Sequence, residues 1–257
     1  MKIKNNDILN NTLMKSNIEN TALVFDIDNT LRDRESGIIP ETAIKAINDA
    51  HEKGYKIYIA TGRSDVDSVV KELIDRGMCI DGFSCANGQR VLDGEGNLMF
   101  SATMNETQNE KILELANKYE IGLVLSTDKG FILTNENIAN KDNIKLLNQL
   151  NTPYTIDNDI NKFTTYNYSL IYDTRNGKAE ALMKEAEEIG LHFKSQRSSD
   201  KYFDIVLDNV TKSTGIDVLK EKDNVEFILD TVVTKINGKD ELANMSFSLN
   251  EMYESNR

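Results

Sequence analysis

Two apolar runs near the start of the chain predict buried strands. Residues 22–25 (ALVF) and 57–60 (IYIA) are continuous runs of apolar or aromatic side chains, and polar residues follow each run at once. Such runs are typical of strands buried on both faces of a parallel sheet. The stretch between them, residues 40–54, carries apolar positions at helical spacing and ends at a glycine. The pattern therefore predicts a strand–helix–strand unit.

The α/β pattern continues through a second predicted helix within residues 61–77 and then changes. From about Asn87, two hairpin-like segments alternate apolar and polar positions around Asp-Gly and Lys-Gly turns. These hairpins cover residues 90–100 and 122–135. Further helices are predicted at residues 106–120, 142–150, 177–190 and 214–222, and further strands at 168–173, 191–196, 203–209 and within 225–236.

These elements predict a two-part α/β protein. We expect a parallel-sheet core formed by residues 1–86 and 198–257, with residues 87–197 inserted as an α+β cap. The chain has no internal repeat and no low-complexity linker. An insertion between two halves of one core is the simplest account of this order.

Composition and charge narrow the range of partners. Of the 257 residues, 39% are hydrophobic and 28% are charged, which is typical of a globular protein. The formal charge is 30 − 42 = −12, so neither nucleic acid nor membrane is expected as a partner. The first twenty residues lack the apolar run of a signal peptide, which predicts a cytoplasmic protein. Two cysteines, Cys79 and Cys85, cannot form a disulfide framework.

Asp26 and Asp28 follow directly after the first buried run. At the carboxyl edge of a parallel sheet, where ligands bind in open α/β folds, residues two apart point the same way. Two carboxylates held together need a cation to offset their charge, and Mg²⁺ prefers oxygen ligands. The alternative is an Asp-rich turn whose side chains only cap the following loop.

Thr61, Gly62 and Arg63 follow the second buried run and precede a predicted helix. Free N–H groups and the helix dipole favour an anion at such a position, and a glycine allows close approach. The alternative is that these are only turn and cap residues. Lys212, between a predicted strand and helix, can neutralise a phosphoryl group, or it can be an ordinary solvated lysine.

The ordered set of motifs resembles the haloacid dehalogenase (HAD) superfamily of phosphohydrolases, and more closely its Cof-like subgroup with a type IIB cap. The first family motif, DxDxT, is matched by Asp26, Asp28 and Thr30, and the second, ATGR, by residues 60–63. Lys212 matches the third motif, and an Asn-Gly that opens the cap is matched by Asn87 and Gly88. The resemblance implies a HAD-like Rossmannoid core with an inserted α+β cap.

The resemblance also implies roles for individual residues. Asp26 is expected to attack phosphorus and form an aspartyl-phosphate, and Asp28 to act as acid and base. Mg²⁺ is expected on the Asp26 carboxylate and the Asp28 main-chain carbonyl. Thr61 and the catalytic Lys212 are expected to complete the cradle around the phosphoryl group, with Thr30 and Gly62 as further phosphate contacts. Apart from these implied roles, Arg63, Asn87 and Arg197 are expected to face the substrate, although Arg63 can equally pair with a surface acid. The expected substrate is a small phosphorylated metabolite; the family likeness favours a sugar phosphate, and a flavin or other cofactor phosphate is the alternative.

One family motif is missing from the sequence. The fourth motif, an acidic turn GDxxxD that completes the Mg²⁺ ligands, has no match, and Asp230 at the end of an apolar run is the best substitute. Asp223, Asp240 and Glu241 are weaker substitutes. This absence leaves a second hypothesis open: a weakly active or inactive HAD-fold protein that binds a phosphorylated ligand or a protein partner. The sequence predicts no oligomeric state.

Overall fold

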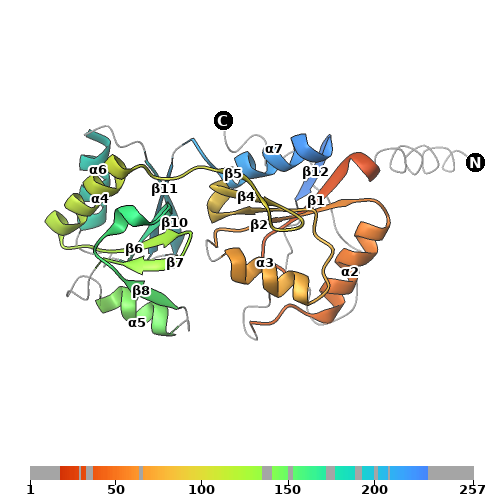
Figure 1. The fold of residues 1–257 in the computed structure, drawn as a ribbon, viewed down its shortest axis with the longest axis horizontal. Coiled ribbons are helices and arrows are strands. Elements are labelled where there is room, and N and C mark those ends of the chain that lie inside the picture. The colour runs from red at the N-terminus through yellow and green to blue at the C-terminus, as the bar shows by residue number, and fades with distance from the viewer. Residues whose placement is uncertain are drawn as a thin grey trace, which may run out of the picture.

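The computed structural model describes ten segments of the chain and arranges them around two sheets. The described segments are residues 18–28, 30–32, 37–63, 66–134, 141–149, 153–171, 177–188, 193–199, 202–207 and 209–230. Each sheet has six strands, with the order β12-β1-β2-β3-β4-β5 in the first and β10-β11-β9-β6-β7-β8 in the second. Figure 1 shows the two sheets and their helices side by side.

The first sheet is parallel over four of its strands. The parallel strands are β1 (Thr21–Phe25), β2 (Lys56–Ala60), β3 (Gly82–Cys85) and β12 (Phe227–Asp230). A hairpin of β4 (Arg90–Asp93) and β5 (Leu98–Ser101) continues the sheet in antiparallel fashion beyond β3. The two strands predicted from the apolar runs are confirmed as β1 and β2.

Helices cover both faces of the first sheet. The helices α2 (Glu41–Glu52) and α3 (Val66–Asp75) lie on one face, and α7 (Lys212–Asp223) lies on the other (Figure 1). Side chains alternate accordingly, since Leu23 and Phe25 of β1 join the core beneath α2 and α3, whereas Ala22 and Val24 join the core beneath α7. This two-sided burial explains why β1 is apolar at every position.

The second sheet is built from strands that come later in the chain. Its strands are β6 (Gly122–Thr127), β7 (Gly130–Leu133), β8 (Tyr154–Ile156), β9 (Thr165–Ile171), β10 (Phe193–Ser199) and β11 (Tyr202–Leu207). Only the β7–β8 pair is parallel among the described pairings of this sheet. The helices α4 (Glu106–Tyr119) and α6 (Lys178–Glu188) share a core with one face, and α5 (Lys141–Gln149) packs on the other. The mixed α/β fold with a separate α+β unit is as predicted.

Strand pairing divides the chain differently from the predicted limits of the cap. We predicted a cap from residue 87 to residue 197, but β4 and β5 belong to the first sheet and both strands of the β10–β11 hairpin belong to the second. Alternating apolar and polar positions reveal a hairpin without indicating which sheet it joins. The chain passes between the sheets after β5 and again after β11.

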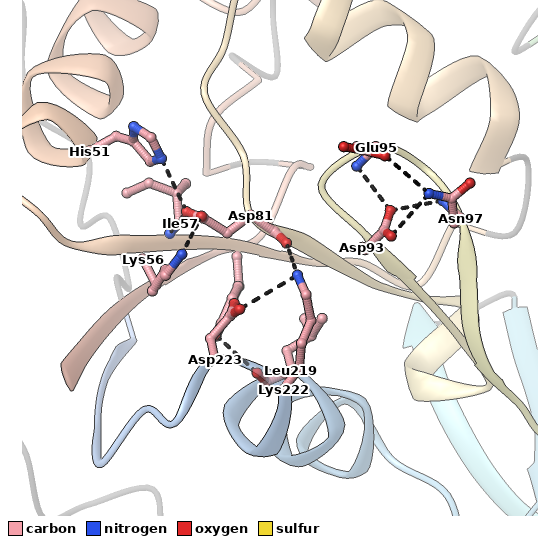
Figure 2. Close-up of polar contacts among 11 residues, drawn as sticks. His51, Lys56, Ile57, Asp81, Asp93, Glu95, Asn97, Leu219, Lys222 and Asp223 are labelled. Carbon is pink, nitrogen blue, oxygen red and sulfur yellow. Dashed lines mark hydrogen bonds and ion pairs between the residues drawn. The ribbon is translucent and has the colours of Figure 1, made fainter. Parts of the chain in front are cut away.

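A polar cluster fastens the first sheet at the edge where its parallel strands begin. The Asp81 carboxylate accepts hydrogen bonds from Lys56 Nζ at 2.8 Å and from the Ile57 main-chain nitrogen at 2.9 Å, and His51 Nε2 lies 3.4 Å away (Figure 2). Lys222 Nζ donates to the Asp81 main-chain oxygen at 3.1 Å. The cluster therefore links α2, β2 and α7 at the edge opposite the predicted site.

The helices of the described segments are too short or too polar to span a membrane. None of those that the structure describes has the length and apolar character needed to cross a bilayer. The apolar run predicted within residues 225–236 forms β12 up to Asp230, and its remainder lies outside the described residues.

Candidate active site

The predicted site residues lie where the parallel strands of the first sheet end. Asp26 and Asp28 follow β1, Thr61 follows β2, and the short 3-10 helix η2 (Ala86–Gly88) follows β3. Because β1, β2 and β3 are parallel neighbours, their carboxyl ends meet at one edge. Lys212 is the first residue of α7 and reaches the same edge.

Asp26 faces the ammonium group of Lys212. Its Oδ2 lies 3.4 Å from Lys212 Nζ, and its Oδ1 accepts a hydrogen bond of 2.9 Å from the main-chain nitrogen of Ile27. The side chains remain 42% and 36% exposed, so a ligand can reach both. Ile27 itself is fully buried, as expected if the residue between the two acids points back into the protein.

Asp28 is held by the guanidinium of Arg63. Arg63 Nε donates to Asp28 Oδ2 at 2.8 Å, and Arg63 Nη2 donates to Asp28 Oδ1 at 2.9 Å. Burial raises the pKa of this carboxyl, but the hydrogen bonds and charge of Arg63, with the charges of Arg32 and Lys212, outweigh it and hold the pKa below its ordinary value. Both acids are thus placed opposite a cation, and Lys212 acts on both.

The loop after β2 is joined to β3 and to η2 by main-chain hydrogen bonds. The Thr61 nitrogen donates to the Ser84 oxygen at 2.8 Å, the Asn87 nitrogen to the Thr61 oxygen at 3.2 Å, and the Ala86 nitrogen to the Arg63 oxygen at 2.8 Å. Thr61 is 1% exposed, and its Oγ1 accepts from the Arg63 nitrogen at 3.1 Å. This pairing fixes the backbone from which the Arg63 side chain extends.

The segment η2 has an unusual backbone. Ala86, Asn87 and Gly88 have φ values of +49°, +56° and +92°, and all are buried. A left-handed conformation is costly for alanine, and such strain is often concentrated at functional sites. A Cβ on Gly88 would lie 1.8 Å from the Thr211 oxygen, and one on Gly62 would lie 3.1 Å from Asn87 Oδ1. The predicted Asn-Gly pair is therefore packed between the loop of β2 and the start of α7.

Three residues that the sequence analysis missed position Lys212. Thr211 caps α7 by accepting at Oγ1 from the Thr214 nitrogen at 3.4 Å, and Ser84 Oγ donates to the Lys212 oxygen at 3.2 Å. Gly215 admits Ser84, because a Cβ there would lie 2.1 Å from Ser84 Oγ. A glycine inside a helical pattern is the sequence signal that indicates such a close approach.

Thr30 and Arg197 are the remaining predicted contact residues, and the structure describes no side-chain contact between them and Asp26, Asp28 or Lys212. Thr30 lies in the turn after Asp28, where its main-chain nitrogen donates to the Ile27 oxygen at 3.3 Å. Arg197 lies on β10 of the second sheet, and its side chain is outside the described part of the structure.

Asp230, the predicted third metal ligand, ends β12 and stands opposite Val24 of β1 in the backbone register. This position is two residues short of Asp26 along the strand direction, and the Asp230 side chain is not among the described groups. Within the described segments, no three His, Cys, Asp or Glu side chains are grouped so that they could hold a metal.

The oxygen donors that are described fit part of a magnesium shell. Mg²⁺ commonly takes one or two carboxylates, completes its shell with water and substrate phosphate, and accepts carbonyl oxygen. The half-exposed Asp26 carboxylate and the Asp28 main-chain carbonyl, both at the sheet edge, are oxygen donors of the types that Mg²⁺ accepts.

Several solved structures resemble the fold. The phosphatase BT1666 from Bacteroides thetaiotaomicron, of the HAD superfamily, is 20% identical with a TM-score of 0.67, covering 82% of this chain and 76% of its own. A HAD subclass IIB sugar phosphatase, BT4131, is 24% identical with a TM-score of 0.65, covering 82% and 79%. TM0651 from Thermotoga maritima is 20% identical with a TM-score of 0.67, covering 79% and 75%.

A comparison with curated proteins finds no match. A family model described as haloacid dehalogenase-like hydrolase matches residues 23–228, which include Asp26, Thr61 and Lys212. The match covers most of the chain and confirms the resemblance seen in the motifs. The protein belongs to the haloacid dehalogenase-like hydrolase family.

Proposed function

We propose that the protein hydrolyses phosphomonoesters of small metabolites through an aspartyl-phosphate. The observation that carries the proposal is the pair Asp26 and Lys212, in which an accessible carboxylate and an ammonium group share the edge of a parallel sheet at 3.4 Å. A carboxylate can attack phosphorus, and a cation beside it stabilises the negative charge of the transferred group.

In the first step, an Asp26 oxygen forms a bond to phosphorus while the bond from phosphorus to the leaving oxygen breaks. The protonated Asp28 carboxyl donates its proton to that oxygen. In the second step, water gives a proton to Asp28 as its oxygen attacks phosphorus, and the bond to Asp26 breaks. The net products are an alcohol and inorganic phosphate.

Arg63 controls when Asp28 can act as an acid. The two hydrogen bonds from Arg63 favour the ionised carboxylate, so moving the guanidinium to another anion would favour the protonated form of Asp28. A dianionic phosphate attracts the same guanidinium. We therefore assign Arg63 to the substrate phosphate during the reaction and to Asp28 when the site is empty of substrate.

Magnesium is the metal we propose for this site, held by the Asp26 carboxylate and the Asp28 main-chain carbonyl, with Asp230 as the third ligand. When bound, Mg²⁺ offsets charge on the phosphoryl oxygens. A sugar phosphate is the proposed substrate, for two reasons. A subclass IIB sugar phosphatase has a similar fold. The motifs also lead us to expect this class of substrate.

Hydrolysis of p-nitrophenyl phosphate tests the proposal. We expect turnover that requires Mg²⁺, is abolished by a chelator, and falls at least about a thousandfold in Asp26→Asn. Asp75→Asn, at an exposed position on α3, is the matched control and keeps full activity. Equal and negligible activity in the wild type and Asp26→Asn would refute hydrolysis.

A second function is favoured by one observation in the sequence, the missing acidic turn GDxxxD. In this alternative the same site binds a phosphorylated ligand without turnover. Inorganic phosphate would then raise the melting temperature of an inert wild-type protein, and Lys212→Met would abolish that increase.

A further inference from the structure

Gln89 directly follows η2 and is fully buried. Its Nε2 donates to the Tyr166 main-chain oxygen and, at 3.4 Å, to the Ala102 oxygen, while its Oε1 accepts from the Leu207 nitrogen at 3.4 Å. Both ends of the carboxamide are therefore used. A buried amide with partners at both ends is strongly oriented, because breaking any bond leaves a buried polar group unsatisfied.

The partners of Gln89 mark the places where the chain passes between the sheets. Ala102 is the first residue after β5, where the chain leaves the first sheet, and Leu207 is the last residue of β11, where it begins to return. Tyr166 lies in β9 of the second sheet. One side chain thus contacts both connections and the second sheet itself.

Neighbouring contacts reinforce this junction. The Ala102 nitrogen donates to the Gln89 main-chain oxygen at 2.9 Å, and the Met104 nitrogen donates to the Thr165 oxygen at 2.8 Å. The guanidinium of Arg90 lies 5.8 Å from the centre of the Tyr166 ring. The first connection is therefore attached to the first sheet at Gln89 and to the second sheet at Thr165.

On its other side, Gln89 adjoins the residues that shape the site. Its main-chain nitrogen donates to the Ala86 oxygen at 3.2 Å. Asn87 is bonded to Thr61, and Gly88 is in contact with Thr211, the residue before Lys212. A displacement of the second sheet would therefore act on η2, and through η2 on both the loop of β2 and the start of α7.

We propose that Gln89 is a positioning residue that sets the placement of the second sheet over the carboxyl edge of the first. Its two donors and one acceptor match two carbonyls and one N–H group, a combination that other side chains of this size do not offer. A glutamate would direct a carboxylate at two carbonyl oxygens, and a methionine would leave all three main-chain groups without these bonds.

A distance measurement between the two sheets tests the proposal without requiring activity. Cys79 is exposed and Cys85 is buried, so spin labels attach to Cys79 and to a cysteine introduced by Glu110→Cys on the exposed side of α4. We expect a narrow distance distribution in this otherwise wild-type protein. Gln89→Glu and Gln89→Met broaden the distribution and shift its maximum, because the junction is then free to open.

Gln108→Glu is the matched control. Gln108 Oε1 accepts from the Asn105 nitrogen at 2.9 Å in the cap of α4, and a carboxylate can accept the same bond. The control should therefore keep the narrow distribution. If the folded Gln89 variants also keep it, the proposal is overturned.

Hydrogen exchange covers the case in which both Gln89 variants fail to fold. In the wild-type protein the Leu207 amide, which donates to Gln89, should be protected about tenfold or more relative to an unstructured peptide. Exchange at the peptide rate would overturn the proposal.

A separate kinetic measurement rests on the proposed function. With p-nitrophenyl phosphate as substrate, Gln89→Met should raise KM more than it lowers kcat, since Asp26 and Lys212 are not altered. Inactivity of the wild type would refute the proposed function alone and leave the distance result in force.

Discussion

Arg63 binds the Asp28 carboxylate through two nitrogens, with Nε at 2.8 Å and Nη2 at 2.9 Å from its two oxygens. A lysine cannot reproduce this planar two-bond arrangement. The pair joins the loop after β2 to the loop after β1 and holds an anion-binding group among the site residues. The same geometry makes Asp28 and a substrate phosphate competitors for one guanidinium.

Replacing Arg63 should therefore weaken phosphate binding. We expect Arg63→Lys to raise KM for p-nitrophenyl phosphate about tenfold and Arg63→Gln to raise it further, because two charge-assisted hydrogen bonds are lost. Arg76→Lys is the control, since Arg76 binds Glu41 and the Ile39 oxygen away from the site. An unchanged KM in Arg63→Gln would contradict a role for Arg63 in binding substrate.

The pairing of Arg63 with Asp28 illustrates what the sequence could not provide. The order of motifs placed both residues at one sheet edge, since an apolar run marks the end of each buried strand. It did not indicate that they contact each other, because a side-chain pairing across two loops depends on tertiary distances. For Asp26 and Lys212, likewise, the order of elements predicted only that both lie at the same edge of the sheet. It did not predict the contact between their side chains.

The strand β3 was missed for a related reason. Its sequence GFSC lacks an apolar run, since Gly82 makes room for Leu219, where a Cβ would lie 2.4 Å from Leu219 Cδ2. Ser84 of the same strand bonds to the Lys212 oxygen. These requirements come from α7, which is more than a hundred residues away in the chain, so local periodicity does not contain them. Gln89 was missed because two of its partners, Tyr166 and Leu207, are likewise far away in the chain.

Lys212→Met should remove the cation from Asp26. We expect kcat/KM for p-nitrophenyl phosphate to fall by about 10²- to 10³-fold, the usual effect of losing one group that stabilises transferred charge. Because the pair is partly exposed to solvent, the free energy of unfolding should change by no more than about 1 kcal/mol. Lys220→Met, on the last turn of the same helix, serves as control. Full activity of Lys212→Met would argue against any catalytic role for this lysine.

Gly88→Ala should destabilise the fold much more than an equivalent change elsewhere. Gly88 and Gly130 have φ values of +92° and +95°, but a Cβ would meet the Thr211 oxygen at 1.8 Å in the first case and no atom within 4 Å in the second. Gly130→Ala should cost about 1 kcal/mol of backbone strain, and Gly88→Ala about 3 kcal/mol or more. Urea unfolding of both variants measures this difference. Equal destabilisation would show that η2 can move away from α7 without cost.

Glu185 joins α6 to α4 through hydrogen bonds, and we expect their contribution to the stability of the fold to depend on pH. Its carboxylate accepts hydrogen bonds from Lys118 Nζ at 2.7 and 2.6 Å and from Tyr119 Oη at 2.7 Å. The bonds from Lys118 and then from Tyr119 hold the pKa of Glu185 below its ordinary value of 4.5. A lowered pKa in the folded state gives stability that is present above the ordinary value and is lost as the pH falls through the folded one.

Glu185→Gln should therefore lower the melting temperature at pH 7, and the difference from wild type should shrink as the pH falls below about 4.5 and Glu185 becomes protonated in both states. Thermal unfolding at pH 7 and at about pH 3 measures this effect. Glu187→Gln, at an exposed position on the same helix, should show no difference at either pH. A gap between Glu185→Gln and wild type that stays constant with pH would contradict a contribution of the ionised carboxylate to the contact between α6 and α4.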